Sequence, residues 1–192
     1  MSVKKRIIIG ISGASGSCLG VYALKALREL PEWESHLIIS KAAEKTMETE
    51  FGGSLQSVIA LADTVYGEGD IGAAISSGSF RTEGMLIAPC SMKTAAGIAC
   101  GYSDNLICRA ADVIIKERRK LVLLARESPL SSIHLRNLLA LSDLGAVIMP
   151  PVPAFYQNPE NIGDIVKHTI GRALGYFGVD TEPFFKPWEG VV

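Results

Sequence analysis

The sequence lacks the features that mark membrane-spanning, secreted or nucleic-acid-binding proteins. No run approaches the roughly 20 apolar residues that a spanning helix needs, and no signal-peptide cleavage site follows the first residues. The four cysteines form no CxxC pair. The 19 Lys and Arg nearly balance the 20 Asp and Glu, which argues against nucleic acid or a membrane surface as partner. We therefore expect a cytoplasmic protein with reduced thiols.

What the sequence does contain is an alternation of short apolar runs and helical patterns. At 192 residues the chain fits one large domain. The patterns predict strands at 6–11, 36–40, 84–88, 121–125 and 146–149, and helices at about 19–30, 41–49, 54–62, 92–101, 105–116, 130–142 and 162–177. This alternation predicts an α/β fold: a three-layer, doubly wound parallel sheet of Rossmann-like or flavodoxin-like type, in a single domain covering 1–192.

Two segments fall outside this alternation. The Gly- and Ser-rich stretch 67–83 is too short for a linker, and we interpret it as a functional loop. The Pro-rich tail, about 179–192, is expected to wrap a neighbouring subunit or the edge of the active site.

In such a sheet the ligand lies beyond the carboxyl ends of the strands. The first strand is followed by Ser12-Gly13-Ala14-Ser15-Gly16, which forms either a phosphate cradle or a simple helix cap. It is not a P-loop, and Ile11 replaces the first glycine of the dinucleotide fingerprint. Ser40 stands where a nicotinamide-binding protein usually has an acid. A mononucleotide is therefore favoured over NAD.

Polar residues also follow the third and fourth strands. Pro89-Cys90-Ser91-Met92-Lys93-Thr94 again offers hydroxyls and helix-start amides. Arg126-Glu127 follows the fourth strand directly, with a surface ion pair as the alternative interpretation. The histidines have neither metal spacing nor a catalytic-triad context, so we interpret them as structural or surface residues; they are His36, His134 and His168.

Several cations lack a matching cluster of acids. Arg109 and Lys116 are seven residues apart and therefore share a helix face. Tyr156 follows the last strand, where the pocket should be, and Arg172 lies on the final helix. This pattern indicates a phosphorylated or polyanionic substrate.

Taken together, these segments resemble the flavin prenyltransferase family of the UbiX and Pad1 type, formerly described as aromatic-acid decarboxylases. The resemblance runs from about Ile7 to Gly178. It is carried by Gly13-Ala14-Ser15-Gly16, Ser40-Lys41-Ala42-Ala43, Glu50, Pro89-Cys90-Ser91-Met92-Lys93-Thr94, Asn105-Leu106-Ile107, Arg109-Ala110-Ala111-Asp112-Val113, Lys116-Glu117-Arg118-Arg119, Arg126-Glu127, Ile133-His134-Leu135 and Pro153-Ala154-Phe155-Tyr156.

The resemblance implies a metal-independent enzyme that joins the dimethylallyl group of dimethylallyl phosphate to N5 and C6 of reduced FMN. It also implies a homododecamer that delivers prenylated FMN to a UbiD-type decarboxylase. The resemblance assigns FMN binding to Gly13, Ala14, Ser15, Ser40, Ser91, Met92, Lys93, Thr94 and Arg126. It assigns binding of the prenyl donor's phosphate to Arg109, Lys116, Arg126, Tyr156 and Arg172.

Four residues are implied to be catalytic, namely Glu50, Lys116, Glu127 and Ser15. We expect Lys116, with Arg172, to stabilise the leaving phosphate. Glu127 is expected to move protons between that phosphate and the flavin. Glu50 is expected to assist bond formation at C6, either electrostatically or as a base.

Two alternatives remain open from the sequence. An FMN-dependent cysteine decarboxylase would share the FMN cradle, but it relies on an early histidine and on an Asn motif near the third strand, and the segment after the first helix lacks a suitable histidine. A non-catalytic FMN carrier, or accessory subunit of an aromatic-acid decarboxylase, would need neither the two acids nor the phosphate-binding cations. The sequence does not distinguish dimethylallyl monophosphate from pyrophosphate, nor the ubiquinone branch from the aromatic-acid branch.

Overall fold

The computed structural model describes residues 4–51, 54–182, 185 and 190. The strands of these residues form one sheet in which every pair is parallel. The strand order is β3-β2-β1-β4-β5-β6, which is the doubly wound Rossmann order and confirms the predicted fold class. The strands are β1 (Lys5–Ile11), β2 (Trp33–Ile39), β3 (Thr64–Tyr66), β4 (Gly84–Cys90), β5 (Lys120–Ala125) and β6 (Val147–Ile148).

The prediction missed one edge strand and overestimated the other. β3 has three residues, and Val65 is exposed, so the segment has too few buried positions to show a strand pattern. The last strand was expected over 146–149, but only Val147–Ile148 pairs with β5. Both differences fall at the two edges of the sheet, where a strand has only one neighbour.

The helices agree closely with their predicted positions. Six of them begin after a residue whose side chain accepts a hydrogen bond from the amide three residues on, namely Ser40, Ser54, Ser91, Asn105, Ser131 and Asn161. No helix within the described residues is long and apolar enough to cross a membrane. The helices are α1 (Cys18–Arg28), α2 (Lys41–Phe51), α3 (Leu55–Ile59), α4 (Met92–Ala99), α5 (Leu106–Lys116), α6 (Ser132–Asp143) and α7 (Ile162–Gly175), with short 3-10 turns η1 (Ala74–Ser76) and η2 (Phe155–Gln157).

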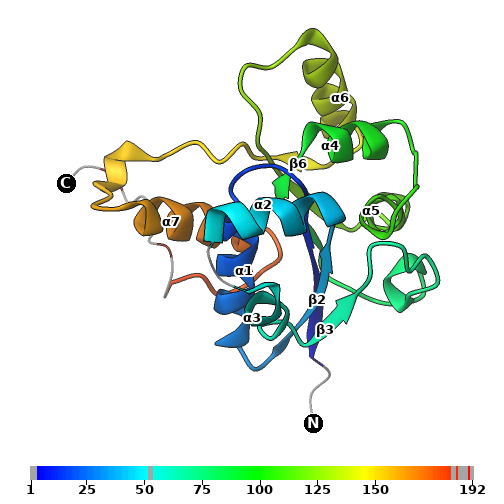
Figure 1. Cartoon of the computed structure of the whole chain (residues 1–192), viewed down its shortest axis with the longest axis horizontal. Coiled ribbons are helices and arrows are strands. Elements are labelled where there is room, and N and C mark those ends of the chain that lie inside the picture. Colours follow the sequence, from blue (N-terminus) through cyan, green and yellow to red (C-terminus); the bar gives the residue numbers. More distant parts are fainter. Residues whose placement is uncertain (1–3, 52–53, 183–184, 186–189, 191–192) are drawn as a thin grey trace.

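The two faces of the sheet form two separate hydrophobic cores. Along β1, Ile7, Ile9 and Ile11 point into a core with α1 and α7, whereas Ile8 points into a core with α4 and α5. This alternation follows from the period of two residues along a strand. Figure 1 shows the resulting layers, with α6 and the segment after β6 extending away from the body of the fold.

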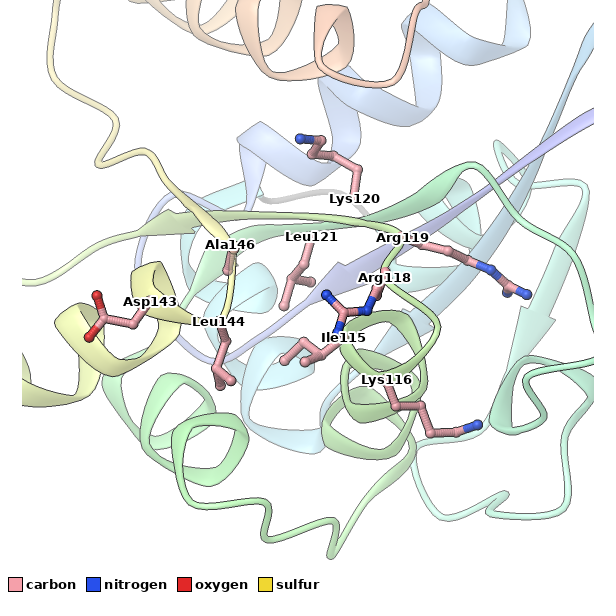
Figure 2. A pocket seen from close by; sticks show the side chains of 10 residues that line it. Ile115, Lys116, Arg118, Arg119, Lys120, Leu121, Asp143, Leu144 and Ala146 are labelled. Carbon is pink, nitrogen blue, oxygen red and sulfur yellow. The ribbon is translucent and has the colours of Figure 1, made fainter.

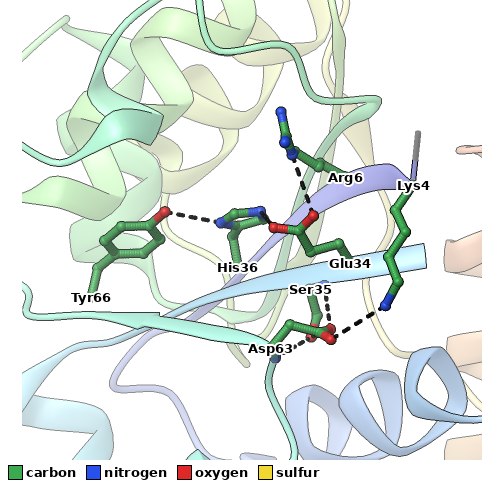
Figure 3. A network of polar contacts seen from close by, with 7 residues as sticks. All are labelled: Lys4, Arg6, Glu34, Ser35, His36, Asp63 and Tyr66. Atoms are coloured by element: carbon green, nitrogen blue, oxygen red, sulfur yellow. Dashed lines mark hydrogen bonds and ion pairs between the residues drawn. The ribbon is translucent and has the colours of Figure 1, made fainter. Parts of the chain in front are cut away.

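A polar network occupies the sheet next to the second core (Figure 3). The Nδ1 atom of His36 lies 2.9 Å from the Tyr66 hydroxyl, and its Nε2 lies 3.1 Å from a carboxylate oxygen of Glu34. Burial lowers the pKa of His36 and favours the neutral ring. A carboxylate only accepts, so the neutral tautomer that suits both contacts has its hydrogen on Nε2, with Nδ1 accepting from Tyr66. These contacts agree with a structural role for this histidine.

His134 is likewise used by the fold. Its Nδ1 accepts from the amide of Ser131, and its own amide donates to the Ser131 hydroxyl, which closes a capping box at the start of α6. Most of the tail that was expected to wrap a neighbour lies outside the described residues. Within them, the ring of Phe185 packs edge-on against His168 at 4.9 Å.

Candidate functional site

The loops that follow β1, β4 and β5 are tied together at the carboxyl end of the sheet. The hydroxyl of the buried Ser12 donates to the Pro89 carbonyl at 2.9 Å and accepts from the Ser91 amide at 2.7 Å. The amide of Arg126 donates to the Cys90 carbonyl at 3.1 Å. The strand order reverses between β1 and β4, so these loops border the crevice where such sheets bind ligands.

The loop after β1 also lies unusually close to the start of α2. A Cβ atom on Gly13 would stand 2.5 Å from the Cβ of Ala42, so a residue without a side chain is required there. The Ser40 amide donates to the Ile11 carbonyl at 3.0 Å, and its hydroxyl accepts from the Ala43 amide at 3.1 Å. Ser40 therefore caps α2 and brings its first turn to the site.

Glu50, at the far end of α2, places its carboxylate on the start of α1. Its oxygens accept from the Gly16 amide at 2.9 and 3.1 Å, the Ser17 amide at 2.9 Å and the Ser17 hydroxyl at 2.7 Å. Partial burial acts to raise the pKa of Glu50, but hydrogen bonds from Ser15, Ser17 and the two amides hold it below its ordinary value. The Gly16 amide of the predicted phosphate cradle, and the Ser17 amide that follows it, are thus bonded to a carboxylate of the protein itself.

Arg126 connects the β5 end to the same loop. Its Nε donates to the Ser15 carbonyl at 3.1 Å, which uses one of five guanidinium N–H groups. Glu127 is exposed and accepts from the amide of Ser128 at 3.0 Å. Both residues stand where the fold presents ligand groups, as the sequence predicted.

The start of α4 supplies the fourth part of the site. Ser91 caps the helix by accepting from the Thr94 amide at 3.3 Å, and its hydroxyl donates to the Thr94 hydroxyl at 3.1 Å. Met92 and Thr94 are largely buried and Lys93 is exposed. The amino end of a helix favours negative charge, so this turn suits a phosphate or a flavin oxygen.

Lys116 lies near the amino ends of the strands, opposite to the carboxyl-edge loops. It ends α5, immediately before β5, and it lines a cavity of about 490 Å³ with Arg118 and Leu144 (Figure 2). Its Nζ contacts Glu117 at 2.7 Å. The six residues of β5 span roughly 20 Å and separate this edge from Arg126. That distance exceeds the length of a lysine side chain, so Lys116 does not reach the carboxyl-edge loops of its own chain.

Three other residues expected to bind the donor phosphate lie on or near α5 and α7. Arg109, near the start of α5, pairs with Asp112 at 2.7 Å. Tyr156 packs its ring edge-on against His168 on α7 at 6.1 Å. Burial, and then the charge of Arg172, lower the pKa of His168. Tyr156 and Arg172 thus belong to one group beside α7.

The predicted site residues therefore fall into separate groups. The loops at the carboxyl edge bring together the FMN-site residues, Glu50 and Glu127, whereas Lys116 and the α7 group lie elsewhere on the chain. Sequence reasoning missed Ser17, and it named Ser12 only as part of the 12–16 segment, without its bridge to Pro89 and Ser91. Ser12 had a usable signal, since a hydroxyl at the last buried position of a strand needs partners across the sheet.

The carboxyl-edge loops fit a phosphorylated flavin. They combine helix-start amides, hydroxyls, a guanidinium and the close approach at Gly13, which are the groups that hold phosphate and a planar ring in this fold class. Among the described residues, no group of three or more His, Cys, Asp or Glu is placed to hold a metal ion.

Comparison with known proteins places this chain among close relatives. The family model described as Flavoprotein matches residues 1–174. Flavin prenyltransferase UbiX of Neisseria meningitidis serogroup B is 51% identical over 187 residues, covering 97% of this chain and 98% of the relative. The crystal structure of AnUbiX (PadA1) in complex with FMN and dimethylallyl pyrophosphate shares 50% identity, with a TM-score of 0.95 over 98% of this chain and 100% of that one.

A further solved structure, a dodecameric FMN-dependent UbiX-like decarboxylase from Escherichia coli O157:H7, shares 54% identity. Its TM-score is 0.93 over 96% of this chain and 100% of that one. About half of the residues are thus identical over nearly the full length of these proteins, and the backbones superpose closely. From this similarity and the flavin-type site at the carboxyl edge of the sheet, the chain belongs to the UbiX-type flavin prenyltransferase family of flavoproteins.

Proposed function

We propose that this protein joins the dimethylallyl group of dimethylallyl phosphate to reduced FMN, giving prenylated FMN. The observation that carries the proposal is the pairing of family membership with a carboxyl-edge site in which Ser15 contacts both Glu50 and Arg126. A flavin carrier would need no carboxylate fixed at that point. An FMN-dependent cysteine decarboxylase is not favoured, because the relatives at half identity are flavin prenyltransferases.

In this proposal the carboxyl-edge loops hold the flavin. The residues that bind FMN are Gly13, Ala14, Ser15, Ser40, Ser91, Met92, Lys93, Thr94 and Arg126. When bound, reduced FMN supplies the two nucleophilic positions, N5 and C6. Arg126 and the helix-start amides at Ser91 offset the phosphate charge, and Glu127 is the acid that moves a proton at the mouth of the site.

The donor phosphate is proposed to be bound by Arg126 at this edge and by residues that lie elsewhere on the chain. The proposed phosphate-binding residues are Arg109, Lys116, Arg126, Tyr156 and Arg172, and Lys116 lies a strand length away from Arg126. We infer that Lys116 serves the site of a neighbouring copy in a homododecamer. The dodecameric relative from E. coli makes this assembly plausible for chains of this fold. Symmetry would then complete every site in the same way.

Mixed oligomers test this arrangement. Lys116→Ala and Glu50→Gln chains are each expected to bind FMN and to form little prenylated flavin alone. If the two residues act from different chains, co-expression at equal levels restores about a quarter of the wild-type activity, because half of the chains keep each residue and the choices are independent. No recovery, with mixed oligomers verified by mass, would place both residues in the site of one chain.

The proposal also covers the use of the product and the compartment of the protein. The product is delivered to a UbiD-type decarboxylase, since a free prenylated flavin has its use as the cofactor of another enzyme. The compartment is the cytoplasm, where thiols stay reduced, in agreement with four cysteines that are all unpaired. A fractionation of the native host that found the protein outside the cytoplasm would contradict this compartment.

A further inference from the structure

Ser17, at the end of the first loop, forms two hydrogen bonds to Glu50. Its side chain is completely buried, and its hydroxyl lies 2.7 Å from Oε2 of Glu50. Its amide donates to the same oxygen at 2.9 Å. The serine stands 33 positions before the acid, so the contact holds the far end of α2 against the start of α1.

We propose that Ser17 is a positioning residue that orients the Glu50 carboxylate toward the prenyl donor and keeps it ionised during the transfer. The proposal rests on the proposed function. Ser17 itself touches neither substrate and acts only through Glu50.

The hydrogen bonds make the two carboxylate oxygens unequal. Oε2 accepts from the Gly16 amide, the Ser17 amide and the Ser17 hydroxyl, whereas Oε1 accepts from the Gly16 amide alone among these groups. Oε2 thus takes three hydrogen bonds, of which Ser17 supplies two, and these fix the orientation of the carboxylate. Ser17 therefore fixes the direction in which the carboxylate faces.

The surroundings favour the charged form of the acid. The hydrogen bonds to the carboxylate outweigh its partial burial and lower its pKa. The neighbouring titratable groups are Cys18 on α1 and, across Ser15, Arg126 beyond β5. Burial first, and then the charge of Glu50, raise the pKa of Cys18, so the thiol stays neutral. A fixed anion of this kind stabilises positive charge that develops on the dimethylallyl group as phosphate leaves.

This assignment decides between the two roles that the sequence left open for Glu50. A carboxylate with a lowered pKa is a weak base, because its proton affinity is reduced. The same carboxylate is a good electrostatic partner for a cation, because its charge persists to lower pH. The structure thus favours the electrostatic role.

The test compares the pH dependence of kcat for Ser17→Ala, Ser17→Thr and the wild-type enzyme. Loss of a hydrogen bond to a charged group raises the carboxylate pKa, so the acidic limb of kcat in Ser17→Ala should move up by about one pH unit. We expect kcat at neutral pH to fall about tenfold and the FMN dissociation constant to stay within about twofold. Ser17→Thr, which keeps the hydroxyl, should restore the wild-type profile.

A Glu50→Gln background distinguishes positioning from packing. In that background Ser17→Ala should change neither kcat nor its pH profile, because the group that Ser17 acts on is gone. An equal loss in both backgrounds, or loss of FMN binding with Ser17→Ala, would overturn the proposal. If wild-type enzyme forms no prenylated flavin, the proposed function fails; if it does and Ser17→Ala has the same profile, only the role of Ser17 fails.

Discussion

Replacing Gly13 by alanine would place a methyl group 2.5 Å from the Cβ of Ala42 and 3.3 Å from its carbonyl carbon. Carbon atoms in contact prefer separations of about 3.5–4.0 Å, so the first loop and the start of α2 would have to move apart by roughly 1 Å. Overpacking of this kind costs about 1–3 kcal/mol of unfolding free energy. In a domain of this size that corresponds to a fall in Tm of about 2–12 °C.

The same displacement would separate two parts of the flavin site. Ser15 stands on the first loop and Ser40 caps α2, and a shift of about 1 Å takes hydrogen bonds beyond their useful range. We therefore expect the FMN dissociation constant of Gly13→Ala to rise about tenfold, the effect of one lost hydrogen bond to a charged group. Thermal unfolding and fluorescence titration with FMN measure the two effects separately.

Gly69→Ala is the matched control, because a Cβ at Gly69 meets no atom within 4 Å. It should leave both Tm and FMN affinity at the wild-type values. A Gly13→Ala protein with wild-type Tm and FMN affinity would refute the close approach of the loop and α2. A Gly69→Ala protein that lost as much would show that the effect is not specific to that contact.

Three further predictions follow from buried or hydrogen-bonded groups. Ser12→Ala leaves two backbone partners without their hydrogen bonds and should lower the unfolding free energy by about 1–3 kcal/mol in denaturant titrations; an unchanged midpoint would contradict the bridge. Partial burial acts to raise the pKa of Asp63, but hydrogen bonds from the Ser35 amide and hydroxyl hold it below the ordinary value. Its contribution to stability is therefore present above the unfolded pKa and is lost as pH falls through the folded pKa. Asp63→Asn should reduce the difference between the free energies of unfolding measured at pH 6 and at about pH 3. The same difference in the variant and the wild type would contradict this prediction. Burial raises the pKa of Cys108 to about 11, and that of Cys90 further, so iodoacetamide near neutral pH should modify neither thiol until the protein is unfolded, as peptide mass mapping would show.

Much of the fold followed from the sequence because the central strands are continuous apolar runs. The strands β1, β2, β4 and β5 are buried on both faces, and parallel strands of that kind have a strong pattern. The edge strands are short and partly exposed, so their pattern is weak. Their detection needs the neighbouring strand, which only the fold supplies.

The site followed in part for a similar reason. Parallel strands end at one edge, so Ser15, Ser91 and Arg126 could be expected to converge there. The position of Lys116 could also have been read from the connectivity, because a helix that ends just before a strand ends at the amino edge of the sheet. The contact between Glu50 and Ser17 could not, since it depends on how the end of α2 packs on another helix.

The central claim is that this protein transfers a prenyl group to reduced FMN. The most direct measurement is anaerobic incubation of the purified protein with reduced FMN and dimethylallyl phosphate, with the pyrophosphate run in parallel, followed by mass spectrometry of the released flavin. A flavin heavier by one five-carbon prenyl unit is the predicted result. Unmodified FMN from both incubations, with FMN shown to be bound, would contradict the claim.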